Sequence, residues 1–179
     1  MNFPLMMQER ICSVDFVLMR RVHRWSAPRW IRLWMMASTR GGDGWLWYAM
    51  LSWVLFFGQE ARWLAIGAVV SGVSTGIGLF LWLKKATGRK RPCHIEPHCW
   101  SKMLPPDQFS FPSGHTITAF AASVPLWTFY PALTEGLLFC ALSVAISRIL
   151  LGMHFVSDVI AGGLIGSLIG WGAVIVWRL

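Results

Sequence analysis

The chain has 179 residues, of which 55% are hydrophobic and 13% are charged, and its formal net charge is +8. Soluble domains carry about 25% charged residues, so about half of the expected water-facing charge is missing and a compact soluble globule is disfavoured. The 12 Trp and 11 Phe residues also argue against intrinsic disorder.

Residues 1–40 form a basic, amphipathic region in which arginines alternate with apolar side chains. We expect helices that lie among lipid headgroups, with an additional spanning helix as the alternative. The dense arginines leave no apolar core for a cleavable signal peptide. We expect no nucleic acid as a partner, because the region leads directly into apolar segments and more readily meets membrane lipids.

Residues 63–83 contain no ionisable side chain and match the length of about 20 residues that a helix needs to cross a bilayer. Similar segments follow at residues 116–134 and 159–177, and shorter ones lie at 44–59 and 136–151. The predicted fold is therefore all-α, a multi-pass transmembrane helix bundle with about five to six spans. We divide the chain into an amphipathic interfacial region, 1–40, and a membrane domain, 41–179.

The polar segment at residues 84–112 and the ends of the flanking spans carry three short motifs. The first is Lys84 with Arg91–Pro92 seven residues later. The second is Pro112–Ser113–Gly114–His115. The third is Ser147–Arg148, followed by His154 and Asp158. In this order and at these spacings the motifs resemble those of the type 2 phosphatidic acid phosphatase (PAP2) superfamily, which includes bacterial membrane lipid phosphatases.

The residue types themselves suit phosphate chemistry. Lys84, Arg91 and Arg148 would neutralise a phosphate group and the charge that develops on it during transfer. Ser113 and Gly114 stand where a helix begins, so their backbone N–H groups would point at an anion. These five residues are the predicted phosphate-binding set.

His154 and Asp158 are four residues apart, which would place them on one face of the last helix. An aspartate bonded to one ring nitrogen leaves the other nitrogen free to attack phosphorus. His115 follows the predicted anion cradle and could protonate the leaving oxygen. The resemblance implies the same catalytic roles, with His154 as the nucleophile that becomes phosphorylated and His115 as the acid.

We expect no metal and no cofactor, because Glu96, Asp107 and Asp158 do not form a magnesium-binding set. Cys93, His94, His98 and Cys99 have unusual spacing for zinc. The two cysteines would form a disulfide in an oxidising compartment and remain free thiols in the cytosol. Lys85, Arg89 and Lys90 match no motif position, so we interpret them as solvated or headgroup-facing charges.

Small residues recur about every four positions in the last span. This stripe predicts close packing against neighbouring helices, with a homodimer as the alternative use. Its members are Gly162, Gly163, Gly166, Ser167, Gly170 and Gly172.

The predicted function is hydrolysis of a lipid or polyprenyl phosphate or pyrophosphate in a bacterial inner membrane. Lipid-to-lipid phosphate transfer and non-catalytic binding of a lipid phosphate are the alternatives. Counting cations by the positive-inside rule would put the site on the cytoplasmic face. The resemblance implies the outer face, which we favour.

Overall fold

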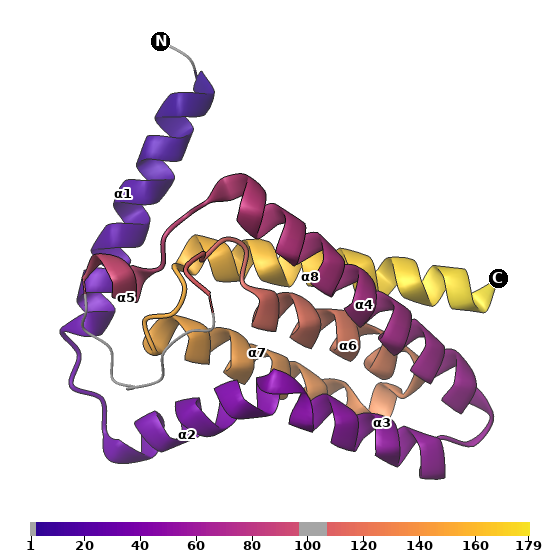
Figure 1. Ribbon diagram of the computed structural model, residues 1–179. Helices are drawn as coiled ribbons and strands as arrows, with labels where there is room; N and C mark the ends of the chain where they lie inside the picture. The colour runs from indigo at the N-terminus through magenta and orange to yellow at the C-terminus, as the bar shows by residue number, and fades with distance from the viewer. Residues whose placement is uncertain (1–2, 97–106) are drawn as a thin grey trace.

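The computed structural model describes residues 3–96 and 107–179, which are mainly helical and contain no strand within those ranges (Figure 1). An isolated β-bridge joins Lys90 and Phe109. The helices are α1 Phe3–His23, α2 Arg29–Arg40, η1 Gly41–Trp45, α3 Leu46–Phe57, η2 Gln59–Ala61, α4 Arg62–Thr87, α5 Pro92–Ile95, α6 Gly114–Phe129, η3 Pro131–Leu133, α7 Thr134–Leu150 and α8 Val156–Arg178.

Helix α6 forms the centre of a bundle with α4, α7 and α8 (Figure 1). Most of its residues are buried, and Ile117, Val124 and Leu126 are wholly inaccessible to solvent. Large apolar side chains on α4 and α8 remain exposed, as expected for helices whose outer faces contact lipid. The all-α bundle predicted from the sequence is confirmed.

The glycines of α8 allow it to approach α6 closely. A Cβ atom added at Gly166 would lie 2.4 Å from the carbonyl oxygen of Ile117, and one at Gly170 would lie 2.8 Å from Cβ of Val124. Gly162 similarly faces the start of α6, whereas Gly172 faces open space. Three positions of the stripe therefore pack within the chain, as the sequence analysis expected.

Within residues 3–96 and 107–179, three helical segments are long and apolar enough to span a membrane, at Gln59–Thr87, Pro131–Leu150 and Val156–Arg178. The predicted total of five to six spans is not confirmed by this measure. The span predicted at residues 116–134 is wrong at its end, because α6 stops at Phe129 and α7 starts at Thr134. Pro131 explains the break, since the residue before a proline is disfavoured in helical geometry.

The turn η1 joins α2 to α3; α2 packs along α7, and α3 contacts α4 (Figure 1). Trp47 and Val54 of α3 enter the same apolar core as Leu137 and Val144 of α7. The predicted domain boundary at residue 40 coincides with the end of α2, but helical structure continues through it. Helix α1 diverges from the bundle towards the N-terminus.

Candidate active site

The three motifs meet at one end of the bundle, where α4 and α7 end and α6 and α8 begin. Lys84 belongs to the last turn of α4, and Arg148 to the last turn of α7. His115 lies in the first turn of α6, and His154 just precedes α8. The charges of Arg148, Arg91 and Lys84 all act on His154, so segments far apart in sequence form one electrostatic cluster.

Arg91 is the most extensively bonded cation of the cluster, and its side chain is 1% exposed. Its Nη1 donates to the carbonyl oxygen of Met153 at 2.9 Å and lies 3.0 Å from Nε2 of His154. A guanidinium has only donors, so Nε2 must accept and the proton of the neutral ring resides on Nδ1. The ring therefore presents the lone pair of Nε2 to Arg91, one of the cations predicted to bind phosphate.

The geometry of His154 and Asp158 differs from the prediction. His154 lies in the loop before α8, and its Nδ1 is 3.7 Å from Oδ2 of Asp158, which is beyond hydrogen-bond distance. Asp158 instead accepts from the backbone N–H of Phe155 at 2.8 Å, which helps to cap the start of α8. The expectation that both residues share a helix face is wrong, because α8 begins at Val156, after His154.

His154 is buried among positive charges. Burial is the largest cause that lowers its pKa well below the ordinary value, and Arg148, Arg91 and Lys84 lower it further. The imidazole is therefore neutral at neutral pH, which keeps the Nε2 lone pair available.

The carboxylate of Asp107 forms ion pairs with two of the three cations that were predicted to bind phosphate. It accepts from Nζ of Lys84 at 2.7 Å and from Nη2 of Arg91 at 2.9 Å. Burial alone would raise its pKa, but these hydrogen bonds hold the pKa of Asp107 below its ordinary value. A phosphate that binds here has to displace or share this carboxylate, which the sequence analysis did not foresee.

The predicted anion cradle at the start of α6 is partly occupied by the protein itself. The backbone N–H of Ser113 donates to the carbonyl oxygen of Asp158 at 3.1 Å, and its hydroxyl accepts from Thr116. Gly114 packs so closely on Phe80 that an added Cβ would lie 3.1 Å from the ring. Ser113 thus helps to join α6 to α8, while the phosphate role of both residues stays a prediction.

The interpretation of Arg89 as a solvated charge is wrong. Arg89 forms ion pairs of 2.6 Å with Asp15 of α1 and with Asp158, whose side chain is wholly buried. Its guanidinium is needed there because a buried carboxylate without a partner is costly. Lys85 and Lys90 are exposed, as expected.

Two residues that the sequence did not predict also contact the site, Thr39 of α2 and Asp43 of η1. Thr39 accepts a hydrogen bond from Nη1 of Arg148, and Asp43 pairs with His115. The signal was the Gly-Gly-Asp-Gly sequence at residues 41–44, an acidic residue among glycines at the start of a predicted span. No motif of the resemblance includes this segment.

Within the described ranges no cluster of three or more histidine, cysteine or acidic residues could hold a metal ion. His98 and Cys99 lie outside those ranges, so the zinc and disulfide predictions concern residues that the structure does not describe.

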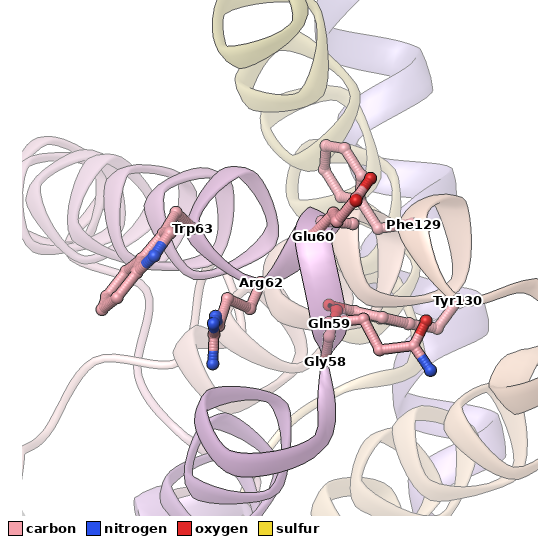
Figure 2. A pocket seen from close by; sticks show the side chains of 8 residues that line it. Gly58, Gln59, Glu60, Arg62, Trp63, Phe129 and Tyr130 are labelled. Atoms are coloured by element: carbon pink, nitrogen blue, oxygen red, sulfur yellow. Dashed lines mark hydrogen bonds between the residues drawn. The ribbon is translucent and has the colours of Figure 1, made fainter.

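A cavity of about 680 Å³ lies at the opposite end of the bundle from the motif residues. It lies where α3 is followed by α4, beside Phe129 and Tyr130 at the end of α6 (Figure 2). None of the predicted site residues lines it, so we do not assign the predicted chemistry to this cavity.

Comparison with known proteins gives relatives that are named as phosphatases of lipid or polyprenyl phosphates. The family model described as the PAP2 superfamily matches residues 60–179. A decaprenylphosphoryl-5-phosphoribose phosphatase of Mycobacterium tuberculosis is 32% identical over 76% of this chain and 77% of its own length. A lipid A 1-phosphatase of Rhizobium etli is 29% identical over 70% of this chain and 61% of its own length.

Solved structures share the fold. A PAP2-type phosphatidylglycerolphosphate phosphatase from Bacillus subtilis superposes with a TM-score of 0.69 at 23% identity, covering 92% of this chain and 84% of the other. LpxE of Aquifex aeolicus superposes with a TM-score of 0.74 at 22% identity, covering 90% and 95%. At this level of identity the similarity concerns the architecture.

Proposed function

Because this chain belongs to the PAP2 superfamily and is a membrane lipid phosphatase, we propose that it hydrolyses a lipid or polyprenyl phosphate or pyrophosphate through a phosphohistidine on His154. One observation carries the proposal: the 3.0 Å contact between Nη1 of Arg91 and Nε2 of His154. It places the lone pair of a neutral imidazole beside a cation that can bind phosphate.

The substrate class rests on what the names of the relatives share. A decaprenylphosphoryl sugar phosphate, the 1-phosphate of lipid A and undecaprenyl diphosphate each combine a phosphate group with a long apolar tail. In this chain a polar cluster at the end of an apolar bundle suits such a molecule, with the phosphate at the cluster and the tail in the bilayer. Membrane lipids are accordingly the proposed substrates and neighbours.

In the first step Nε2 of His154 attacks phosphorus, and the bond from phosphorus to the leaving oxygen breaks. His115 gives its proton to that oxygen, so the product leaves as a neutral alcohol or, from a pyrophosphate, as a protonated phosphate. Lys84, Arg91 and Arg148 stabilise the charge on the phosphoryl oxygens. Asp158, 3.7 Å from Nδ1, stabilises the positive charge that the ring acquires.

In the second step a water molecule attacks the phosphohistidine. The bond from phosphorus to Nε2 breaks, and the water gives a proton to His115, which restores the acid. Inorganic phosphate is released and His154 is again neutral. Because the chain's own cations and histidines carry each step, we propose that the reaction needs no metal ion.

The experiment compares two alanine variants in detergent on two substrates. We expect His154→Ala to abolish turnover of both p-nitrophenyl phosphate and a lipid phosphate. His115→Ala should lower kcat on the lipid phosphate by about 10²-fold or more, and far less on p-nitrophenyl phosphate, whose leaving group needs no acid. EDTA should leave the wild-type rate unchanged.

Three outcomes would contradict the proposal. Turnover in His154→Ala equal to that of the wild type would rule out His154 as the nucleophile. Equal losses on the two substrates in His115→Ala would rule out His115 as the acid. Activity that is lost in EDTA and restored by Mg²⁺ would show that the reaction needs a metal ion. Transfer of the phosphate to an acceptor lipid instead of to water would favour the phosphotransferase alternative.

A further inference from the structure

A kinked turn, η1, separates α2 from α3 beside the candidate active site. It has the sequence Gly-Gly-Asp-Gly-Trp, and Gly44 adopts a φ of 128°, which residues with a side chain rarely adopt. The central residue of this turn is Asp43.

The glycines let the backbone of the turn lie directly against the catalytic helices. A Cβ added at Gly42 would lie 2.8 Å from Cγ1 of Val144 on α7 and 3.2 Å from Cδ2 of His115 on α6. Any larger residue at this position would push the turn away from the histidine ring. The close approach brings the next side chain, Asp43, to the edge of that ring.

The contact is a short, directional hydrogen bond. Oδ1 of Asp43 lies 2.6 Å from Nε2 of His115, and because an ionised carboxylate only accepts, Nε2 carries the proton. Thr39, one helical turn earlier on the same face, accepts from Nη1 of Arg148. One face of the segment formed by α2 and η1 therefore contacts two residues of the predicted site from α6 and α7.

We infer that Asp43 is a positioning residue for the reaction, whose carboxylate orients His115 and stabilises its protonated form for proton transfer to the leaving oxygen. The inference rests on the proposed function, in which His115 is the acid. One ring nitrogen is fixed by the carboxylate, and the other remains for the transferred proton.

The charges around His115 explain why such a partner is needed. Burial, the largest cause, and the charges of Arg148 from α7 and Lys84 from α4 lower the pKa of His115 to about 4. His154, which also lies near, is neutral at neutral pH and offers no compensation. Asp43 is the negative charge that acts on His115 and favours the protonated ring. Without it, His115 would lose its proton at a lower pH.

The test is Asp43→Asn, which keeps the size of the side chain and removes its charge. We expect kcat on a lipid phosphate to fall about 10- to 100-fold, with a much smaller fall on p-nitrophenyl phosphate. The basic limb of the kcat profile, which reports loss of the acid's proton, should move to lower pH, and Asp43→Glu should restore part of the rate. Glu60→Gln, at the opposite end of the bundle, is the control and should behave as the wild type.

A double variant separates this inference from the proposed function. If Asp43 acts through His115, adding Asp43→Asn to His115→Ala should cause no further loss. Further loss in the double variant, or an unmoved basic limb in a folded Asp43→Asn protein, would overturn the role of Asp43. If His115→Ala itself shows no dependence on the leaving group, the acid assignment fails first. Thermal unfolding of each variant in detergent identifies losses of activity that are caused by misfolding. If Asp43→Asn does not fold, Asp43→Glu is compared with the wild type instead.

Discussion

At the scale of single residues, the site is a set of buried cations whose partners are already inside the protein. Lys84 and Arg91 bind Asp107, Arg148 bonds to Thr39, and Arg91 also contacts His154. Fixed positive charges that converge in a buried place repel one another, so the folded chain needs such partners before the substrate arrives. Under the proposed function, phosphate binding is therefore an exchange of acceptors, and its strength depends on how firmly the internal acceptors are held.

Replacement of Asp107 by asparagine tests this exchange. The carboxylate is 36% exposed and its pKa is below the ordinary value, so it stays ionised through the neutral range and competes with phosphate there. Partly exposed ion pairs contribute up to about 1 kcal/mol each, so Asp107→Asn should tighten inhibition by vanadate about three- to tenfold.

Glu96→Gln is the matched control for this measurement. Its carboxylate is 37% exposed and forms an ion pair with Arg20, which is not among the predicted site residues, so vanadate inhibition should not change. Weaker inhibition in Asp107→Asn would show instead that the carboxylate holds Lys84 and Arg91 in the geometry that binds phosphate.

At the scale of helices, the sequence predicted the elements that carry a strong local signal. Long apolar runs predicted the region of α4 and that of α8, and the motif spacings indicated which residues meet at the site. Pairings between distant elements were not predictable, because Asp15, Thr39 and Asp43 belong to no motif and only the folded chain brings them to Arg89, Arg148 and His115. The end of α6 was not predicted correctly, because the apolar run of its sequence continues beyond Phe129.

The packing of α8 on α6 gives a prediction with an internal control. Gly166→Ala would place a Cβ 2.4 Å from the backbone of Ile117, which cannot move without shifting α6. Overpacking of this kind costs about 1–3 kcal/mol, so the midpoint of thermal unfolding in detergent should fall by several degrees. Gly172→Ala lies on the same helix in open space and should leave the midpoint unchanged or raise it. Equal midpoints for the two variants would contradict close packing of α6 and α8.

At the scale of the whole molecule, the antiparallel arrangement of the bundle separates two ends. One end has the cations predicted to bind phosphate, together with the start of α6 and of α8. The other end has the cavity of Figure 2 and the C-terminal part of α8. The N-terminal helix is linked to the catalytic end by the ion pair of Asp15 with Arg89. A single bilayer orientation therefore determines the side of the site and the side of the C-terminus together.

The positive-inside rule counts cations in loops, whereas three cations at this end of the bundle are buried. Lys84, Arg91 and Arg148 are buried in the site, with 7%, 1% and 3% of their surfaces exposed, and are needed there whichever side the site faces. These cations do not report on orientation as loop cations do. The count that favours a cytoplasmic site is weakened accordingly, and we predict that the site faces outward.

Cysteine accessibility tests this prediction in intact spheroplasts. In a variant whose four native cysteines are replaced by serine, Lys90→Cys introduces a thiol at the exposed catalytic end, and Glu60→Cys introduces one at the opposite end. A membrane-impermeant maleimide should label Lys90→Cys in intact cells and Glu60→Cys only after the membrane is opened. Retained phosphatase activity in both variants shows that each is folded. The reverse labelling pattern would place the catalytic cluster on the cytoplasmic side, so its lipid phosphate would have to be drawn from the inner leaflet.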